Sequence, residues 1–402
     1  MPEDAPFGTQ FFLAFCLPGG YNDGEQRSNR RKEGASMQAN RIAHRGCLLG
    51  LAVGDAMGYT VDRKSWAEIQ EDYGPNGLLG YDLVNGYADV TSYTQLAAFT
   101  CNGLLLGITW GQMKGRMAPY VRYIAMSDQE WCVSQRPWGR PARTYCWLMQ
   151  MPEMCRRRCM DTRMMDTITQ GRAGTPEERI NQFQGPGSLT TAVGVGLFFD
   201  PERMEQKEID RLGAEAVALT HGSPLAFLTG AAVAHITSRC IHSRDLSLWD
   251  LYAETLQMLE DRFGHEYTQT YELCAIVRQA IHYARTPSVP PRDAMERLRC
   301  VNAAQVLAGA VYATLVCEGD FDRAVITAVN HSGRSAAVGA LTGAILGARL
   351  GEQALPDFYL ECLEPVDILR ELADDVFQGC PMGQGSRLFD GDWDRKYLHG
   401  GK

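Results

Sequence analysis

The sequence predicts an all-α protein built from many helices, and three observations support that prediction. From Met37 to about residue 378, helical periodicity recurs in segment after segment, separated by glycine, proline and polar breaks. The alternation of apolar and polar residues that is typical of a strand is almost absent. Two of the segments carry a glycine at every fourth position, which places these glycines on one face of a helix.

The two ends of the chain lack this periodicity. Residues 17–36 are polar and glycine-rich, so we expect residues 1–36 to form a disordered leader, with Met37 as an alternative start. The helical domain then spans residues 37–378. The last stretch, residues 379–402, is rich in glycine with three aromatic residues, and we expect a flexible tail there.

Small residues recur on one face of three predicted helices. Each glycine costs a helix roughly 1 kcal/mol relative to alanine, so four on one face must be offset by something. The physical candidate is very close helix approach, backbone against backbone, in the middle of the bundle. The three stripes are Gly46, Gly50, Gly54 and Gly58; Gly339, Gly343, Gly347 and Gly351; and Ala226, Gly230, Ala234 and Ser238.

Composition narrows the class of function. With 39 basic and 48 acidic residues the net charge is −9, which disfavours nucleic acids and anionic membrane surfaces as partners. No stretch reaches the ~18 uncharged apolar residues of a membrane span. The 13 cysteines contain no C-x-x-C pair, and the acidic start of the chain is wrong for a signal peptide. We therefore expect a cytoplasmic protein, and we expect it to be a monomer.

Two polar segments are interpreted structurally. The basic cluster "CRRRCMDTR" at 155–163 is typical of a solvated helix face. The segment "GRAGTPEERI" at 171–180 looks like a helix start, with Thr175 as the cap and Pro176 in the first turn. We assign no chemistry to either segment.

Three loops contain groups suited to a polar ligand. Each loop precedes a helix of small residues, and exposed backbone amides at a helix start form an anion site that glycines let a diphosphate approach. The alternative for any single loop is an ordinary turn or helix cap. The loops are "GPGSL" at 185–189, "THGSP" at 220–224 and "NHSGRS" at 330–335.

Four ordered blocks of the sequence resemble the signature blocks of the ADP-ribosylglycohydrolase family, which includes ADP-ribosylarginine hydrolase and dinitrogenase reductase-activating glycohydrolase. The resemblance covers roughly residues 40–378 and implies a compact orthogonal bundle of helices. It also implies a cleft that binds ADP-ribose and hydrolyses its bond to a protein side chain with two magnesium ions. The blocks are "GCLLGLAVGDAMG" (46–58), "GPGSLTTAVGVGLFF" (185–199), "LGAEAVALTHGSPLAFLTGAAVA" (212–234) and "AVNHSGRSAAVGALTGAILGARLG" (328–351).

The sequence departs from the family pattern at the residues that bind the metal ions in the family. The family pattern is Ser-Asp-Asp-Thr in one block and Asp-x-Asp-Ser/Thr in another, and these align with residues 91–94 and 334–337. Only Thr94 keeps its type. The four aspartates are replaced by Ser92, Tyr93, Arg334 and Ala336.

A site without these carboxylates offers too little charge to hold magnesium, so we predict no metal cofactor. Arg334 is always protonated, and we expect it either to hold an anionic ligand or to pair with Asp55 or Asp89. Tyr93 would fill the volume that the ions leave.

Three functions remain open from the sequence. The first is a metal-free pseudoenzyme that binds ADP-ribose, a related nucleotide or an ADP-ribosylated protein. The second is a hydrolase with altered chemistry, in which Asp55 or Asp89 acts as general base, with His331 as a further acid or base candidate, or in which Asp62 or Asp89 rebuilds a metal site. The third is a structural or regulatory subunit without a ligand. The predicted ligand-binding residues are Asp55, Tyr93, Thr94, Gly185, Gly187, Ser188, His221, Asn330, His331, Ser332, Gly333 and Arg334.

Overall fold

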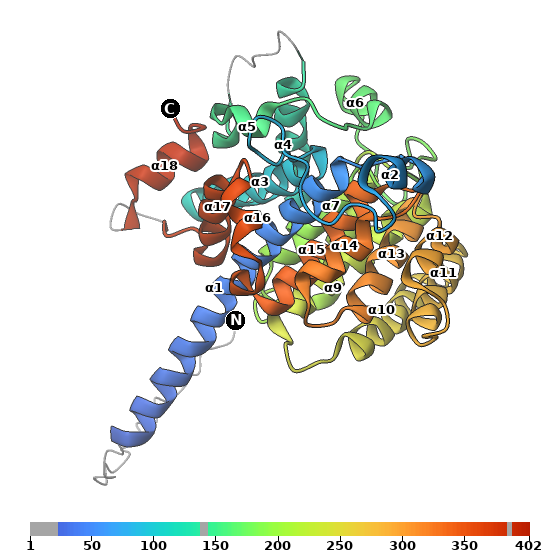
Figure 1. Ribbon diagram of the computed structural model, residues 1–402. Coiled ribbons are helices and arrows are strands. Elements are labelled where there is room, and N and C mark those ends of the chain that lie inside the picture. Colours follow the sequence, from blue (N-terminus) through green and yellow to red (C-terminus); the bar gives the residue numbers. More distant parts are fainter. Residues whose placement is uncertain (1–22, 137–143, 384–387) are drawn as a thin grey trace, which may run out of the picture. The chain divides into compact units, whose positions relative to one another are not determined.

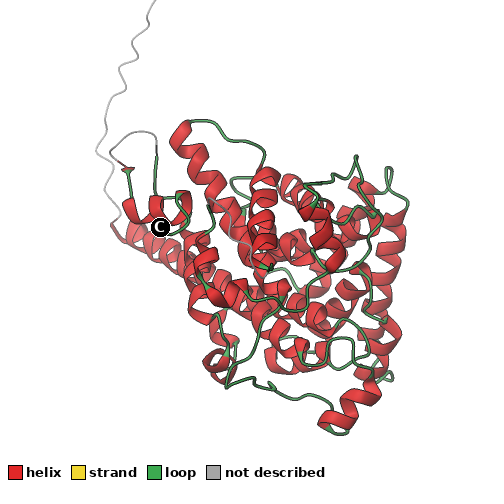
Figure 2. Ribbon diagram, turned by 90° about the horizontal axis from the view of Figure 1, so that it is seen from above, coloured by secondary structure: helices red, strands yellow, loops and turns green. Residues whose placement is uncertain are grey.

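The fold is all-α, as predicted, in a computed structural model whose described residues are 23–136, 144–383 and 388–402. Apart from two isolated bridges, which join Val84 to Tyr87 and Ala88 to Leu363, the described residues contain no β-structure (Figure 2). No helix in the described ranges is long and apolar enough to cross a membrane. The helices are α1 (Asp23–Tyr59), α2 (Trp66–Tyr73), α3 (Ser92–Lys114), α4 (Tyr120–Ser134), η1 (Trp147–Gln150), α5 (Pro152–Cys155), α6 (Thr162–Thr169), α7 (Leu189–Phe198), α8 (Gln206–Ala218), α9 (Pro224–His242), α10 (Leu248–Phe263), α11 (Gln269–Ala284), α12 (Pro291–Leu298), α13 (Ala303–Val316), α14 (Phe321–Val329), α15 (Ser335–Leu350), η2 (Glu352–Ala354), α16 (Asp357–Cys362), α17 (Val366–Gln378) and α18 (Gly391–Leu398).

The chain divides into two units, Met1–Gln38 and Ala39–Lys402. In the first unit the described backbone is helical from Asp23 onward, as the N-terminal part of α1. This helical backbone differs from the disordered leader that we expect over residues 1–36. Residues 1–22 of that leader lie outside the described residues.

The second unit is organised around the contact between α1 and α15, which lie side by side in its centre (Figure 1). The two helices run antiparallel with their glycines facing each other, and a methyl group built on any of these glycines would overlap the backbone of the other helix. The prediction of backbone-to-backbone contact is therefore confirmed. The facing pairs are Gly46 with Gly347, Gly50 with Gly343, Gly54 with Gly339, and Gly58 with Ser335.

The third small-residue stripe serves the same purpose on α9, which is buried along most of its length. A methyl group on Gly230 would lie 2.7 Å from the carbonyl oxygen of Gly213 on α8, and one on Gly213 would lie 2.8 Å from the oxygen of Gly230. Ala234 on the same stripe faces Gly196 of α7. Three helices thus pack together at a distance that only small residues allow.

The C-terminal tail is packed against the bundle where the structure describes it, which differs from the flexible tail that we expect from its glycine content. On α18, Trp393 and Tyr397 are buried. The indole Nε1 of Trp393 donates to Thr109 Oγ1 on α3 at 2.9 Å, and Lys396 and Tyr397 both bind Asp375 on α17. Buried aromatic area and these polar contacts outweigh the local tendency of glycine to disorder.

Two further local predictions are wrong. The segment 171–180 forms no helix, although the backbone N–H of Glu178 donates to Thr175 Oγ1 at 2.9 Å as a helix cap would require. The cluster 155–163 is not one helix face, because α5 ends at Cys155 and Arg158 is buried. In both segments tertiary contacts override the local helical signal.

Candidate functional site

Asp55 lies on α1 and caps the start of α3. Its side chain is fully buried, and its two carboxylate oxygens accept four hydrogen bonds from Thr91 and Thr94. Both hydroxyl donors are 2.6 Å away, and the backbone N–H donors are at 2.8 and 3.1 Å. Burial raises the pKa of Asp55 to about 6, against the lowering effect of these four bonds. The hydroxyls at 91 and 94 therefore bind a carboxylate of the protein itself.

Arg334 pairs with a carboxylate other than the ones we expected. It is the residue before α15, its side chain is 14% exposed, and its Nη2 donates to the Tyr93 hydroxyl at 2.9 Å. Its Nε lies 3.5 Å from Asp62 Oδ2. The expected pairing with Asp55 or Asp89 is wrong, because Asp62, at the turn that follows α1, is the carboxylate that reaches the guanidinium.

Asp62 has partners on both of its oxygens. Oδ1 accepts the backbone N–H of Ala336 at 3.2 Å, so the carboxylate also caps α15. Oδ2 accepts the Cys159 thiol at 3.4 Å and lies 3.4 Å from Arg63 Nε. Burial, with Asp62 second, raises the pKa of Cys159 to about 12, so the thiol stays protonated at neutral pH.

Asp89 belongs to a different ion pair. Its Oδ1 lies 3.0 Å from Arg158 Nη2, and the same guanidinium binds Glu364 through Nη1 at 2.7 Å. Arg158 and Glu364 are both nearly buried. This arrangement explains why part of the basic cluster at 155–163 is withdrawn from solvent.

These residues do not fit the magnesium pair that the family resemblance implies. Magnesium requires near-octahedral oxygen ligands, and the oxygens of Asp55 and Asp62 already accept hydrogen bonds from protein donors. The cation of Arg334 lies beside Asp62, and it would repel a metal at close range. In the described part of the chain, no three histidine, cysteine, aspartate or glutamate side chains are grouped as metal ligands would be.

His221 is the centre of a second polar group. Its Nδ1 lies 2.9 Å from both Ser188 Oγ and Thr220 Oγ1, while Nε2 lies 3.9 Å from Asp161 Oδ2. The Nε2 atom is buried and has no hydrogen-bond partner among the described residues. Burial is the main cause that lowers the pKa of His221 to about 4, so the ring is neutral at neutral pH. A buried ring nitrogen without a partner is costly, and a ligand could satisfy it.

The glycine turn at 185–187 brings the backbone close to this histidine. A methyl group on Gly187 would lie 3.0 Å from the Asp161 side chain and 3.3 Å from the His221 ring. One on Gly185 would lie 3.5 Å from the Arg163 guanidinium, which covers the ring of Phe183 at 4.9 Å. A cation, an aromatic ring and a glycine turn are the groups with which proteins commonly bind phosphate and base.

Asp161, Arg163 and Phe183 also belong to this site, although none of them is among the residues that we predict from the sequence. Asp161 caps α6 through the backbone N–H of Arg163, at 3.0 Å. Asp161 and Arg163 stand at the end of the basic cluster 155–163, whereas Phe183 lies outside it, and nothing in the spacing connects any of the three to His221. The chain reversal that brings them together is a tertiary feature.

The loop 330–335 is occupied by contacts within the protein. The side-chain amide of Asn330 binds the backbone of Leu78 on both sides, at 2.8 and 2.9 Å. Ser332 donates to Glu296 at 2.9 Å, and Gly333 donates its N–H to Nδ1 of His331 at 2.9 Å. His331 is buried, which lowers its pKa to about 4. Four of the predicted ligand-binding residues, Asn330, His331, Ser332 and Gly333, therefore make contacts within the protein.

The Arg334 group and the His221 group are neighbours. Thr190 Oγ1 at the start of α7 donates to the Tyr93 carbonyl oxygen at 2.7 Å. The segment from Cys159 to Asp161 contacts both groups, since Cys159 binds Asp62 and Asp161 faces His221. The structure thus brings together Tyr93, Thr94, Ser188, His221 and Arg334 with the starts of α3, α7 and α15.

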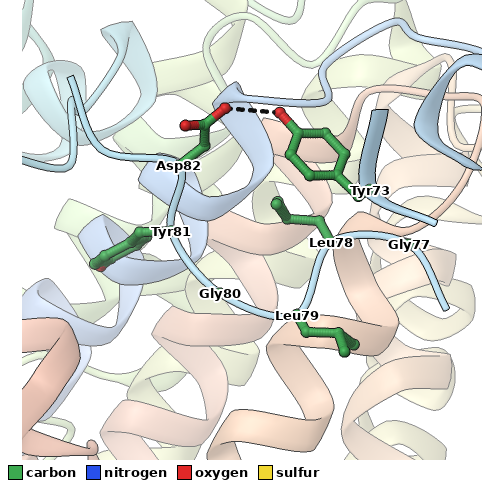
Figure 3. Close-up of a pocket in the computed structure, with 7 residues that line it drawn as sticks. All are labelled: Tyr73, Gly77, Leu78, Leu79, Gly80, Tyr81 and Asp82. Atoms are coloured by element: carbon green, nitrogen blue, oxygen red, sulfur yellow. Dashed lines mark hydrogen bonds between the residues drawn. The ribbon is translucent and has the colours of Figure 1, made fainter. Parts of the chain in front are cut away.

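An open pocket of about 350 Å³ lies beside the loop that leads into this site. Figure 3 shows its lining, in which the Tyr73 hydroxyl donates to Asp82 Oδ2 at 2.9 Å. The lining residues are Tyr73, Gly77, Leu78, Leu79, Gly80, Tyr81 and Asp82. The Asn330 amide fixes the backbone of Leu78, which is one of these lining residues.

The chain is similar to known proteins in both sequence and fold. The model of the ADP-ribosylglycohydrolase family matches residues 37–385. An uncharacterized protein of Archaeoglobus fulgidus is 24% identical over 338 residues, which are 83% of this chain and 95% of that protein. A solved structure described as an ADP-ribosylglycohydrolase-related protein complex aligns with a TM-score of 0.53 at 18% identity, over 85% of this chain and 99% of that chain. At this identity the last likeness concerns the fold alone.

Proposed function

Since the chain belongs to the ADP-ribosylglycohydrolase family, we propose that it is a metal-free pseudoenzyme that binds ADP-ribose, a related nucleotide or an ADP-ribosylated protein. The observation that carries this proposal is the Tyr93–Arg334–Asp62 group. It puts a cation and a neutral phenol at the positions that align with the family's metal-binding aspartates.

The charge of this group favours an anionic ligand over a metal. Removing four carboxylates and adding one guanidinium changes the formal charge of the family's metal site by about five units, which reverses its electrostatic preference. A guanidinium offers planar, paired donors that match phosphate geometry. The Arg334 side chain is 14% exposed, so part of it can be reached from solvent.

The polar group around His221 supports binding of the other part of a nucleotide. The His221 Nε2, which has no hydrogen-bond partner in the described part of the chain, lies next to the close glycine turn and the Arg163–Phe183 stack. These groups need no metal to bind a diphosphate or a base.

The alternative of a working hydrolase has less support. Asp55, the first candidate for a general base, is fully buried and accepts four hydrogen bonds, so it has no accessible lone pair for an attacking water. Asp89 is held in an ion pair with Arg158, and His331 Nδ1 is engaged by Gly333.

The test is calorimetric titration with ADP-ribose, with and without magnesium, on the parent protein and on Arg334 variants. We expect binding that magnesium does not strengthen, lost in Arg334→Asp and partly kept in Arg334→Lys because charge survives without the planar fork. Arg278→Asp, on α11 and exposed, is the matched control and should bind like the parent.

Hydrolysis is measured in parallel on ADP-ribosyl-arginine and ADP-ribosyl-serine peptides. Magnesium-dependent release of ADP-ribose at rates typical of enzymes, ~1 per second or more, would contradict the pseudoenzyme proposal. The absence of any ADP-ribose binding by a folded protein would instead favour the structural subunit.

A further inference from the structure

The loop between α2 and α3 ends in an ordered hairpin. Val84 and Tyr87 exchange both backbone hydrogen bonds, at 2.9 and 3.1 Å. The two residues between them, Asn85 and Gly86, have φ angles of 53° and 85°. Positive φ at both central residues is the signature of a type I′ turn, the tight connection that Asn-Gly favours.

This hairpin exposes apolar side chains instead of hiding them. Leu79, Val84 and Tyr87 are 57%, 55% and 55% exposed, and Leu83 is 42% exposed. Single exposed apolar residues are ordinary, but several gathered on one short ordered segment are not.

Helix α16 extends the same surface. The N–H of Ala88 donates to the carbonyl oxygen of Cys362 at 2.8 Å, and the rings of Tyr81 and Tyr359 meet edge to face at 4.9 Å. Phe358, next to Tyr359, is 56% exposed. We name the group Leu79, Leu83, Val84, Tyr87 and Phe358 the hairpin surface.

The two chain segments that form the hairpin surface carry acidic but no basic side chains, and the nearby Arg156 and Arg158 are already paired with Glu364 and Asp89. No lysine, arginine or histidine occurs between Lys64 and Lys114, or between Arg349 and Arg370, whereas both stretches contain aspartates and glutamates. Among the described residues, no basic side chain pairs with the exposed Asp82, Asp357 or Glu361.

The pocket in Figure 3 adjoins this surface and adds a place for an anchor. Leu79 belongs to both, and Asp82 stands at the pocket, where it accepts the Tyr73 hydroxyl. A carboxylate with one phenol donor keeps lone pairs free for a further donor.

We propose that the hairpin surface is a docking site for a basic segment of a partner protein that carries apolar or aromatic anchors. The anchors cover the five exposed apolar side chains and enter the pocket, while lysine or arginine side chains meet Asp82, Asp357 and Glu361. The complementarity of charge selects this partner class over acidic proteins and nucleic acids. The proposal does not depend on nucleotide binding, because none of these residues belongs to the Arg334 or His221 groups.

The test uses fluorescence anisotropy with three labelled peptides of equal length. One alternates arginine with leucine and tryptophan, the second replaces arginine by glutamate, and the third replaces the apolar residues by serine. We expect only the first peptide to bind the full-length protein, with an affinity that falls as salt rises.

The decisive variant is Val84→Ser/Tyr87→Ser, which should weaken binding by about tenfold or more, since central apolar anchors dominate such interfaces. Val301→Ser/Tyr271→Ser is the matched control, because these residues are 52% and 54% exposed at other places on the molecule. Asp82→Lys/Glu361→Lys should also abolish binding of the arginine peptide, whereas Asp367→Lys, fully exposed on α17, should not.

Equal binding of the acidic peptide, equal losses in the control pair, or no binding of any peptide would overturn the proposal. So would sedimentation showing that the parent self-associates through Val84 and Tyr87, since the surface would then fit a second copy of this chain. Circular dichroism and melting temperature of each variant separate loss of binding from loss of folding.

Discussion

Replacing Gly343 by alanine would place a methyl group inside the contact between α1 and α15. The new Cβ would lie 2.6 Å from the carbonyl carbon of Gly50, and closer still to its oxygen. Ordinary carbon–carbon contact is 3.5 to 4.0 Å, so the two helices would have to separate by about 1 Å.

The expected loss of stability follows from that separation. A gap of about 1 Å forfeits a quarter to a half of each dispersion contact, and it affects neighbouring pairs such as Gly54 with Gly339 because helices move as rigid bodies. Overpacking typically costs ~1 to 3 kcal/mol, while alanine returns roughly 1 kcal/mol through helix propensity. We therefore expect a net loss of about 1 kcal/mol, and at most about 2 kcal/mol, with a larger loss for Gly343→Leu or Gly50→Leu.

The assay is urea unfolding followed by circular dichroism, with Gly391→Ala as the matched control. Gly391 is also helical, and among the described residues its Cβ would meet only the Phe389 ring, at 3.7 Å, so this change should be neutral or slightly stabilising. If Gly343→Ala were as stable as the parent with an unchanged m-value, the helices would not be in backbone contact and the packing argument would fail.

Four other perturbations test the remaining features. Burial raises the pKa of Asp128 to about 7, so the protonated carboxyl contributes stability below about pH 4 that is lost as the pH rises through 7. Asp128→Asn should therefore raise the free energy of unfolding by up to about 4 kcal/mol at pH 8. A gain in stability that does not shrink toward pH 4 would contradict this prediction. The pKa of His221 is lowered to about 4, so its effect on stability has the opposite dependence on pH. The free energy of unfolding should be highest above pH 6.5 and should fall by about 3 kcal/mol between pH 6.5 and pH 4. Denaturation midpoints that do not change between these pH values would refute this prediction. Trp393→Ala should lower the free energy of unfolding by ~3 to 5 kcal/mol because the indole is buried. An unchanged melting temperature would instead support a flexible tail. Shortening the chain to start at Met37 should leave the melting temperature unchanged, and a drop of several degrees would show that residues 1–36 contribute to the core.

Some parts of the site could be anticipated and others could not. The three loops at 185–189, 220–224 and 330–335 do precede helices of small residues, because glycine and capping residues act on the backbone within a few positions. The replacement of acidic ligands by Tyr93 and Arg334 is visible as residue type alone. The partner of Arg334 is not, because several carboxylates were candidates by sequence and only their positions in space select one.

The sequence by itself determined the helical class of this protein and the close contact of its central helices. A glycine at every fourth position is costly in an isolated helix, so a stripe such as Gly46 to Gly58 has meaning only if another backbone lies against it. That inference needs no knowledge of distant residues.

Only the tertiary structure decided which side chains meet. It paired Arg334 with Asp62, bound Asp55 to the start of α3, and packed Trp393 against α3 although the tail is rich in glycine. In each case the contact joins residues far apart in the chain, and its energy depends on burial and on the direction of each side chain. Burial and side-chain direction cannot be predicted from the local sequence, because both arise only when the helices have packed.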